Sequence, residues 1–245
     1  MLLNVEPELD MHDPQQAMSA MRAADMVVAL SAYKHHATEY ADVLLPIAPF
    51  TETSGTFVST EGRAQSFKGA VKPLGEARPA WKVLRVLGNL LDVPGFDYDT
   101  SEAVCDETLT TINVADKLNN HVSGVAVQPV TASAHQGMQR VSDVPIYFAD
   151  AVVRRATALQ KTRDAAMPRV TMHGSELQKL GVKSGDTVNV SQGNGSVRLA
   201  VLANDRMPMH TVHISAGHPA TTALGAMFGT ITVEPIDAGQ TGERA

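Results

Sequence analysis

Two carboxylates and one arginine stand close together in a stretch rich in Thr, Ser and Gly. Glu52 and Glu61 could form a pair for acid–base work. Arg63, separated from Glu61 only by Gly62, offers a planar guanidinium that can hold a phosphate or a carboxylate with two hydrogen bonds. The alternative is structural: Arg63 pairs with Glu52 or Glu61 and pins a hairpin to a sheet. The residue types alone leave both interpretations open.

Other residues of chemical interest favour structural roles. His210 and His213 are three apart in a predicted strand, so they point to opposite faces and should not share one metal ion with His218. Residues 193–195 read Gly-Asn-Gly, but a dinucleotide fingerprint needs a third glycine and a following helix. Arg198 holds that third place and a strand follows, so we interpret the pair as a hairpin turn.

Composition limits the classes of function. The 245 residues are 44% hydrophobic and 19% charged, with a formal net charge of −6, which is typical of a globular protein that does not bind nucleic acid. Cys105 is the one cysteine, so the chain cannot hold a four-thiolate iron–sulfur cluster or an internal disulfide. No apolar run approaches the roughly 20 residues that span a bilayer, so we expect no direct membrane insertion. The opening residues are not typical of a signal peptide, and we expect Met1 to be an internal position of a longer chain.

Residues 1–95 predict a partial α/β domain. The segments 2–5, 26–30 and 43–47 are apolar runs of strand length, and Asp13 followed by Pro14 predicts the start of a helix between the first two. Strands that are apolar on both faces are usually buried in a parallel sheet. The alternation of strand and helix therefore predicts the remnant of a doubly wound parallel sheet.

A hairpin and a strong helix complete this part. Residues 56–58 and 64–67 predict the two arms of the hairpin, and Pro79 predicts the start of the helix. The expected buried stripe of that helix consists of Trp81, Leu84, Leu87 and Leu91. Residues 96–165 predict a helical and irregular connector, with a weaker helix at 101–112.

Residues 166–236 predict an all-β domain. Ser175 and Gln178 predict a capped helix, and Gly181 marks its end. Residues 187–191 and 196–202 alternate in hydrophobicity on either side of the 192–195 hairpin, with Val188, Val190, Val197, Leu199 and Val201 in the inward phase. We expect residues 237–245 to form a mobile tail.

Four segments carry a resemblance to a known family. They are Ala41-Asp-Val-Leu-Leu-Pro46, Glu52-Thr-Ser-Gly-Thr56, Glu61-Gly-Arg-Ala-Gln65 and Arg78-Pro-Ala-Trp-Lys-Val-Leu-Arg-Val-Leu-Gly-Asn89. The first three resemble the signature of the molybdopterin oxidoreductase superfamily. The fourth looks like the G subunit of bacterial NADH:quinone oxidoreductase, respiratory complex I.

The resemblance implies a fold and a site. It identifies the last domain as a double-psi β-barrel, similar to the molybdopterin dinucleotide-binding domain. In cofactor-bearing relatives, the region of Glu61, Gly62 and Arg63 lies close to the pterin, so these residues are the candidate cofactor-binding group. Where such relatives commonly have Asn, this chain has Ser59.

The resemblance also implies a function. We expect the C-terminal part of the G subunit, a packing portion of the peripheral arm that holds no molybdenum or other redox centre and is not catalytic by itself. Iron–sulfur clusters are expected only in an N-terminal cysteine-rich part of that protein. That part and other peripheral-arm subunits are the expected partners, at the cytoplasmic side of the bacterial inner membrane. The alternatives are a portion of a true molybdopterin-dependent oxidoreductase and an independent small binding module.

Overall fold

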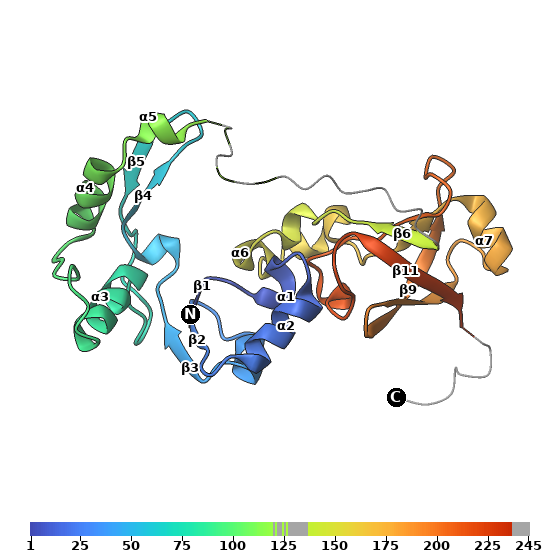
Figure 1. Cartoon of the computed structure of the whole chain (residues 1–245), viewed down its shortest axis with the longest axis horizontal. Coiled ribbons are helices and arrows are strands. Elements are labelled where there is room, and N and C mark those ends of the chain that lie inside the picture. The colour runs from blue at the N-terminus through green and yellow to red at the C-terminus, as the bar shows by residue number, and fades with distance from the viewer. Residues whose placement is uncertain (120, 122–123, 125, 127–136, 237–245) are drawn as a thin grey trace. The chain divides into compact units, whose positions relative to one another are not determined.

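The chain folds into two compact units made of interleaved segments (Figure 1). The computed structural model describes residues 1–119, 121, 124, 126 and 137–236. Unit 1 comprises residues 1–4 and 26–129, and unit 2 comprises residues 5–25 and 130–245. The chain therefore enters unit 2 once near its N-terminus, returns to unit 1, and finishes in unit 2. The predicted mobile tail, residues 237–245, lies outside the described residues.

A three-stranded parallel sheet is the centre of unit 1. Its strands are β1 (Leu2–Leu3), β2 (Val28–Ser31) and β3 (Val43–Pro46), in the order β1-β2-β3. Ala29 and Leu30 of the central strand are buried, as the apolar run predicts. A short 3-10 helix, η1 (His36–Glu39), connects β2 to β3. The expected parallel pairing is confirmed for all three strands.

The predicted hairpin follows the short helix η2 (Phe50–Glu52). Strands β4 (Gly55–Val58) and β5 (Ala64–Phe67) pair antiparallel, with the rings of Phe57 and Phe67 stacked 5.3 Å apart. An isolated two-stranded hairpin is marginally stable in water, so it needs cover from other elements. In unit 1 part of that cover comes from helix α4 (Ser101–Thr111), which lies against β4; α5 (Val114–Lys117) follows it in the chain.

Helix α3 (Ala80–Leu90) begins directly after Pro79, as predicted, but its expected buried stripe is wrong: Trp81, Leu84 and Leu87 are only half-buried, and Leu91 lies beyond the helix. Leu91 is 65% exposed, whereas Gly88 is buried. The ring of Phe96 packs on Gly88 so closely that a Cβ there would lie 2.3 Å from the ring. The buried face of a helix is predicted from the spacing of its apolar side chains. A face that packs through a glycine is missed, because glycine has no side chain.

Unit 2 is built on a closed six-stranded barrel in the order β10-β6-β11-β8-β9-β7. In chain order the strands are β6 (Met138–Val141), β7 (Val170–Met172), β8 (Thr187–Gln192), β9 (Gly195–Ala203), β10 (Thr211–His213) and β11 (Gly229–Pro235). The β8–β9 hairpin and the inward positions are confirmed: Val188, Val190, Leu199 and Val201 belong to the barrel core, and Val197 packs against it. β6 comes from within the predicted connector, residues 96–165.

Unit 2 also contains short helices. They are α1 (Pro7–Asp10), α2 (Pro14–Ala23), η3 (Ile146–Phe148), α6 (Ala151–Arg154), η4 (Leu159–Lys161), η5 (Arg163–Ala165), α7 (Gly174–Leu180) and η6 (Pro219–Thr221). Asp13 caps α2 as predicted, and Gly181 ends α7 in the left-handed conformation. The predicted cap of α7 is wrong, because His173 and not Ser175 caps the helix. The Nδ1 atom of His173 accepts a hydrogen bond from the backbone N–H of Ser175 in the first turn. The ring nitrogen of a histidine can take the capping place usually held by Ser, Thr, Asp or Asn, which a search for those residues does not detect.

Candidate functional site

The candidate group Glu61, Gly62 and Arg63 lies at the turn between β4 and β5. Ser59 closes this turn: its backbone carbonyl accepts from the N–H of Gly62 at 2.9 Å, and its N–H donates to the carbonyl of Arg63 at 3.0 Å. Gly62 adopts a positive φ of 82°, and a Cβ there would lie 2.5 Å from Leu118. Glycine at this position therefore satisfies both the turn and the packing.

The charged side chains of the turn are exposed to solvent. Glu61 and Arg63 both lie on the surface, and among the described residues no ion pair joins Arg63 to a carboxylate. Glu52 instead accepts from the backbone N–H of Leu74 at 3.0 Å. The predicted pairing of Arg63 with Glu52 or Glu61 is therefore absent from this described part of the chain. The guanidinium remains able to contact an anion from solvent.

A buried guanidinium in unit 2 is the polar centre that sequence reasoning missed. Arg140 of β6 is 2% exposed, and its Nη1 donates to Oε1 of Gln192 at 2.9 Å and to the carbonyls of Gly225 and Ala226 at 3.2 and 3.3 Å. Its Nη2 donates to the carbonyl of Ile214 at 3.5 Å. These acceptors are all neutral, and Nε has no hydrogen-bond partner in the described structure. Desolvation lowers the pKa of Arg140 to about 10, so the group stays charged at neutral pH.

The arginine ties separate loops to the barrel. Its acceptors come from the end of β8, the residue after β10 and the loop before β11, so one side chain holds three segments together. Gln192 extends the cluster by donating to the carbonyl of Ala226 at 2.8 Å. The signal in the sequence was weak, because Arg140 is a charged residue at an inward position of a four-residue strand.

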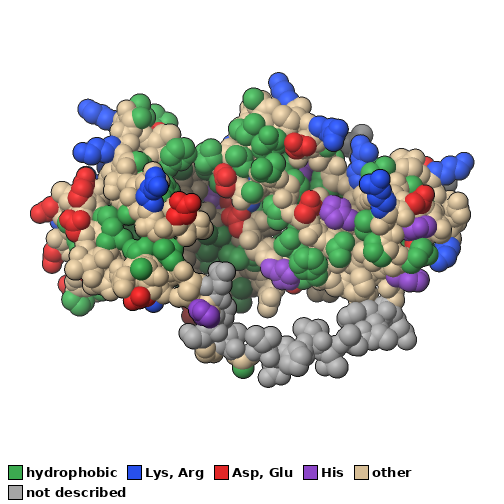
Figure 2. Space-filling model, turned by 90° about the horizontal axis from the view of Figure 1, so that it is seen from above, with side chains coloured by type: hydrophobic (Ala, Val, Ile, Leu, Met, Phe, Trp, Pro, Cys, Tyr) green, Lys and Arg blue, Asp and Glu red, His purple; other side chains and the backbone are tan. Residues whose placement is uncertain are grey.

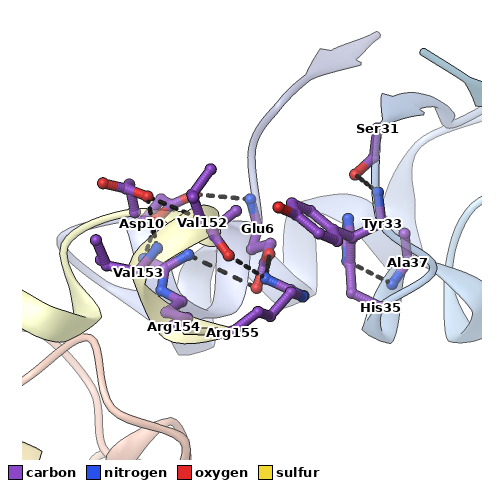
Figure 3. A network of polar contacts seen from close by, with 12 residues as sticks. Glu6, Asp10, Ser31, Tyr33, His35, Ala37, Val152, Val153, Arg154 and Arg155 are labelled. Carbon is purple, nitrogen blue, oxygen red and sulfur yellow. Dashed lines mark hydrogen bonds and ion pairs between the residues drawn. The ribbon is translucent and has the colours of Figure 1, made fainter. Parts of the chain in front are cut away.

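A second polar network joins helix α1 to α6 within unit 2 (Figure 3). Glu6 lies 2.7 Å from Nη1 of Arg155 and 3.6 Å from Nη1 of Arg154, and Arg154 also pairs with Asp10. The side chains of Glu6 and Arg154 are only 5% and 6% exposed. Nε of Arg154 donates to the carbonyl of Phe148 at 2.8 Å. The network therefore fixes residues that are about 150 positions apart in the sequence.

His210, His213 and His218 each contact different residues. His213 lies 3.1 Å from Asp143, whereas His210 lies 4.0 Å from Glu176. His218 is buried against Phe148, and its Nδ1 accepts from the N–H of Ala220. Within the described ranges there is no group of three His, Cys, Asp or Glu residues that could hold a metal ion. The same ranges contain no helix long and apolar enough to cross a membrane.

Comparisons with known proteins find two family models that match different segments of the chain. The molybdopterin oxidoreductase model matches residues 1–90, and the model described as "Molydopterin dinucleotide binding domain" matches residues 145–243. The chain is therefore similar to molybdopterin oxidoreductases in two separate segments.

The predicted resemblance to the G subunit of NADH-quinone oxidoreductase is confirmed. The G subunit of that enzyme from Streptomyces coelicolor is 29% identical over 235 residues, which cover 91% of this chain and 27% of the relative. A putative formate dehydrogenase of Staphylococcus aureus is 38% identical over 81 residues, or 33% of this chain and 8% of the relative. The chain thus spans 27% or less of the length of these relatives.

A solved structure shares the fold. Acetylene hydratase from Pelobacter acetylenicus aligns with a TM-score of 0.62 and 15% sequence identity, over 94% of this chain and 43% of that chain. At this identity the likeness shows the fold alone, and it supports the mixed α/β architecture with a closed barrel.

The pterin cofactor that the family implies does not fit the two arginines that could meet it. A ligand of this size is usually held in a concave site with a few convergent polar groups. Arg63 instead projects from an exposed turn, and Arg140 has its terminal nitrogens occupied by protein carbonyls and Gln192. Neither Arg63 nor Arg140 by itself therefore offers a pterin site.

Proposed function

We propose that this chain is the C-terminal part of the G subunit of NADH:quinone oxidoreductase and serves as a packing portion of the peripheral arm, without a redox centre of its own. The observation that carries the proposal is the similarity to the Streptomyces protein, which extends over 91% of the chain and so includes segments of both units. The single thiol, Cys105, excludes a four-thiolate cluster within these residues.

The surface of unit 1 supports a packing role. Leu74, Leu90 and Phe57 are 82%, 76% and 68% exposed, and the buried hydrophobic cluster of the described residues lies in unit 2. Exposed apolar side chains that gather into one patch are typical of a surface that another protein part covers, and we propose that these side chains form such a patch. We propose that this part is the iron–sulfur portion of the same subunit together with neighbouring peripheral-arm subunits, on the cytoplasmic side of the bacterial inner membrane.

The finer features of the fold belong to the same proposal. The barrel of unit 2 is proposed to be a double-psi barrel, and the parallel sheet of unit 1 to be the remnant of a doubly wound sheet. The domain limits 1–95, 96–165 and 166–236 remain proposals. Glu61, Gly62 and Arg63 are proposed as a vestige of the pterin-site region.

Purification of the intact oxidoreductase tests this function. Cells that make this chain with an affinity tag should yield NADH:quinone oxidoreductase in which the chain is present at one copy per copy of the other peripheral-arm subunits, measured by quantitative mass spectrometry. Active complex that lacks the chain would refute the packing role. Recovery of the tagged chain without any oxidoreductase subunit would favour an independent binding module.

The match of the dinucleotide-binding model over residues 145–243 favours a second candidate, a portion of a molybdopterin-dependent oxidoreductase. Elemental analysis of the same purified complex separates the two. Molybdenum or tungsten near one equivalent per chain would support the pterin enzyme, whereas a negligible content would support the packing role.

A further inference from the structure

The negative charge of this chain is concentrated in one stretch. Residues 86–116 contain seven Asp and Glu and no Lys or Arg, whereas the whole chain has a net charge of −6. The remaining residues therefore carry a net charge of +1. The acidic stretch includes the end of α3, all of α4 and most of α5. In the left part of Figure 2, which shows unit 1, acidic and hydrophobic side chains lie beside one another.

An open cleft lies between β4 and α4 within this acidic region. Two adjoining hollows of about 270 and 200 Å³ share five lining residues, so they form one continuous groove. We call this groove the α4 cleft and define it by Thr56, Trp81, Glu102, Cys105 and Asp106.

The walls of the α4 cleft are held in place from both sides. The hydroxyl oxygens of Ser54, the residue before β4, and of Ser101, in the first turn of α4, lie 2.6 Å apart. A Cβ at Gly55 would lie 2.7 Å from the ring of Phe67, so the ring can lie against the backbone only because that residue is glycine. The groove is thus a feature of the packing of α4 on the hairpin rather than of a single side-chain position.

The acidic side chains of the α4 cleft line one of its two hollows. Val58, Trp81 and Leu109 line one hollow, whereas Glu102 and Asp106 line the other. Glu102 and Asp106 are four residues apart, so they share a face of α4. Hydrogen bonds from its own backbone N–H and from the Ser101 hydroxyl lower the pKa of Glu102, which keeps this carboxylate charged. Lys68 is the basic residue at the same hollow and offsets one of the two charges.

We propose that the α4 cleft docks a basic partner segment, in which an apolar side chain enters the hollow beside Trp81 and an adjacent Lys or Arg lies between Glu102 and Asp106. The inference rests on the proposed packing role and adds the chemistry of the partner. Charge complementarity selects this occupant, because an acidic segment or a nucleic acid would meet the seven carboxylates of the surrounding stretch. A partner segment of this kind would also shield the exposed face of α4.

Two residues report on the cleft directly, because Trp81 and Cys105 are the one tryptophan and the one cysteine of the chain. The probe is a blocked hexapeptide with a central Leu-Phe pair flanked by four lysines, and its twin carries four glutamates. At low salt the lysine peptide should bind the 245-residue chain at least 10-fold more tightly than its twin, shift the tryptophan emission, and slow alkylation of the thiol by iodoacetamide. The preference should shrink at 0.5 M salt, because screening weakens exposed charge pairs.

Matched variants locate the binding. The double variant Glu102→Gln/Asp106→Asn should reduce the preference at least 5-fold, whereas Asp92→Asn/Asp97→Asn, which removes two charges of the same stretch outside the cleft, should leave most of it. Equal binding of the two peptides, or binding that leaves the thiol as reactive as before, would overturn the docking site. Thermal melts confirm that each variant is folded. The outcome does not depend on whether the chain purifies with the oxidoreductase, so failure of the cleft and failure of the proposed function are distinguishable.

Discussion

Removal of Arg154 tests whether residues 5–25 are energetically part of the barrel unit. The Arg154→Ala variant removes the ion-pair partner of Asp10, which keeps only the backbone N–H of Glu6, and leaves the carboxylate of Glu6, whose side chain is 5% exposed, with Arg155 as its one ion-pair partner. Loss of one partner from a buried ion pair costs about 3–5 kcal/mol. Because Arg155 still lies 2.7 Å from Glu6 and Asp10 is 26% exposed, we expect the lower part of that range, about 3 kcal/mol in the free energy of unfolding.

Urea denaturation followed by circular dichroism measures this loss. The matched control is Arg163→Ala, because Arg163 is an exposed arginine in η5, and its loss should cost less than about 0.5 kcal/mol. A cycle with Glu6→Gln should show non-additivity of about 1 kcal/mol or more, because the two residues share one network. If Arg154→Ala unfolds at the same urea concentration as Arg163→Ala, the network is not what fixes α1 and α2 to the barrel.

Three further predictions concern unit 2. Burial lowers the pKa of His218, so the unfolded chain takes up the proton before the folded chain does as the pH falls below about 6.5. The stability of the folded chain should therefore decrease as the pH falls through this range. The variant His218→Asn, which keeps a capping acceptor, should show a smaller decrease in melting temperature between pH 7.5 and 5.5. Gly195→Ala should destabilise by more than about 3 kcal/mol in chemical denaturation, because the new Cβ would lie 1.7 Å from the carbonyl oxygen of Ala223, and a melting temperature equal to that of the parent chain would contradict this contact. Arg140→Lys should lower the free energy of unfolding by about 2–4 kcal/mol in the same assay, because one ammonium group cannot bond to Gln192 and to the loop carbonyls at the same time as a forked guanidinium can. A loss below about 1 kcal/mol would show that the loops do not depend on the guanidinium.

Much of the local structure could be predicted from the sequence. Apolar runs marked the three parallel strands, the Asp13–Pro14 pair marked the start of α2, and the alternation around residues 192–195 marked the β8–β9 hairpin with its inward residues. These features depend on neighbours within a few positions, so the sequence records them directly. The family resemblance rested on local motifs in the same way and is confirmed by matches to models of both segments.

The candidate site depended on contacts that no local pattern records. The turn that carries Glu61, Gly62 and Arg63 was predicted, but its exposure and the absence of an Arg63 ion pair in the described residues follow from how the hairpin packs.

By itself, then, the sequence determined the three parallel strands, the start of α2, the β8–β9 hairpin, the resemblance to a known family and the presence of a single thiol. Only the tertiary structure decided that residues 5–25 belong with the barrel, that β6 closes it, and that Arg140 and Glu6 are buried. The physical reason is range: a strand or a cap is stabilised by adjacent residues, whereas a buried charge is tolerated only where distant segments bring its partners together.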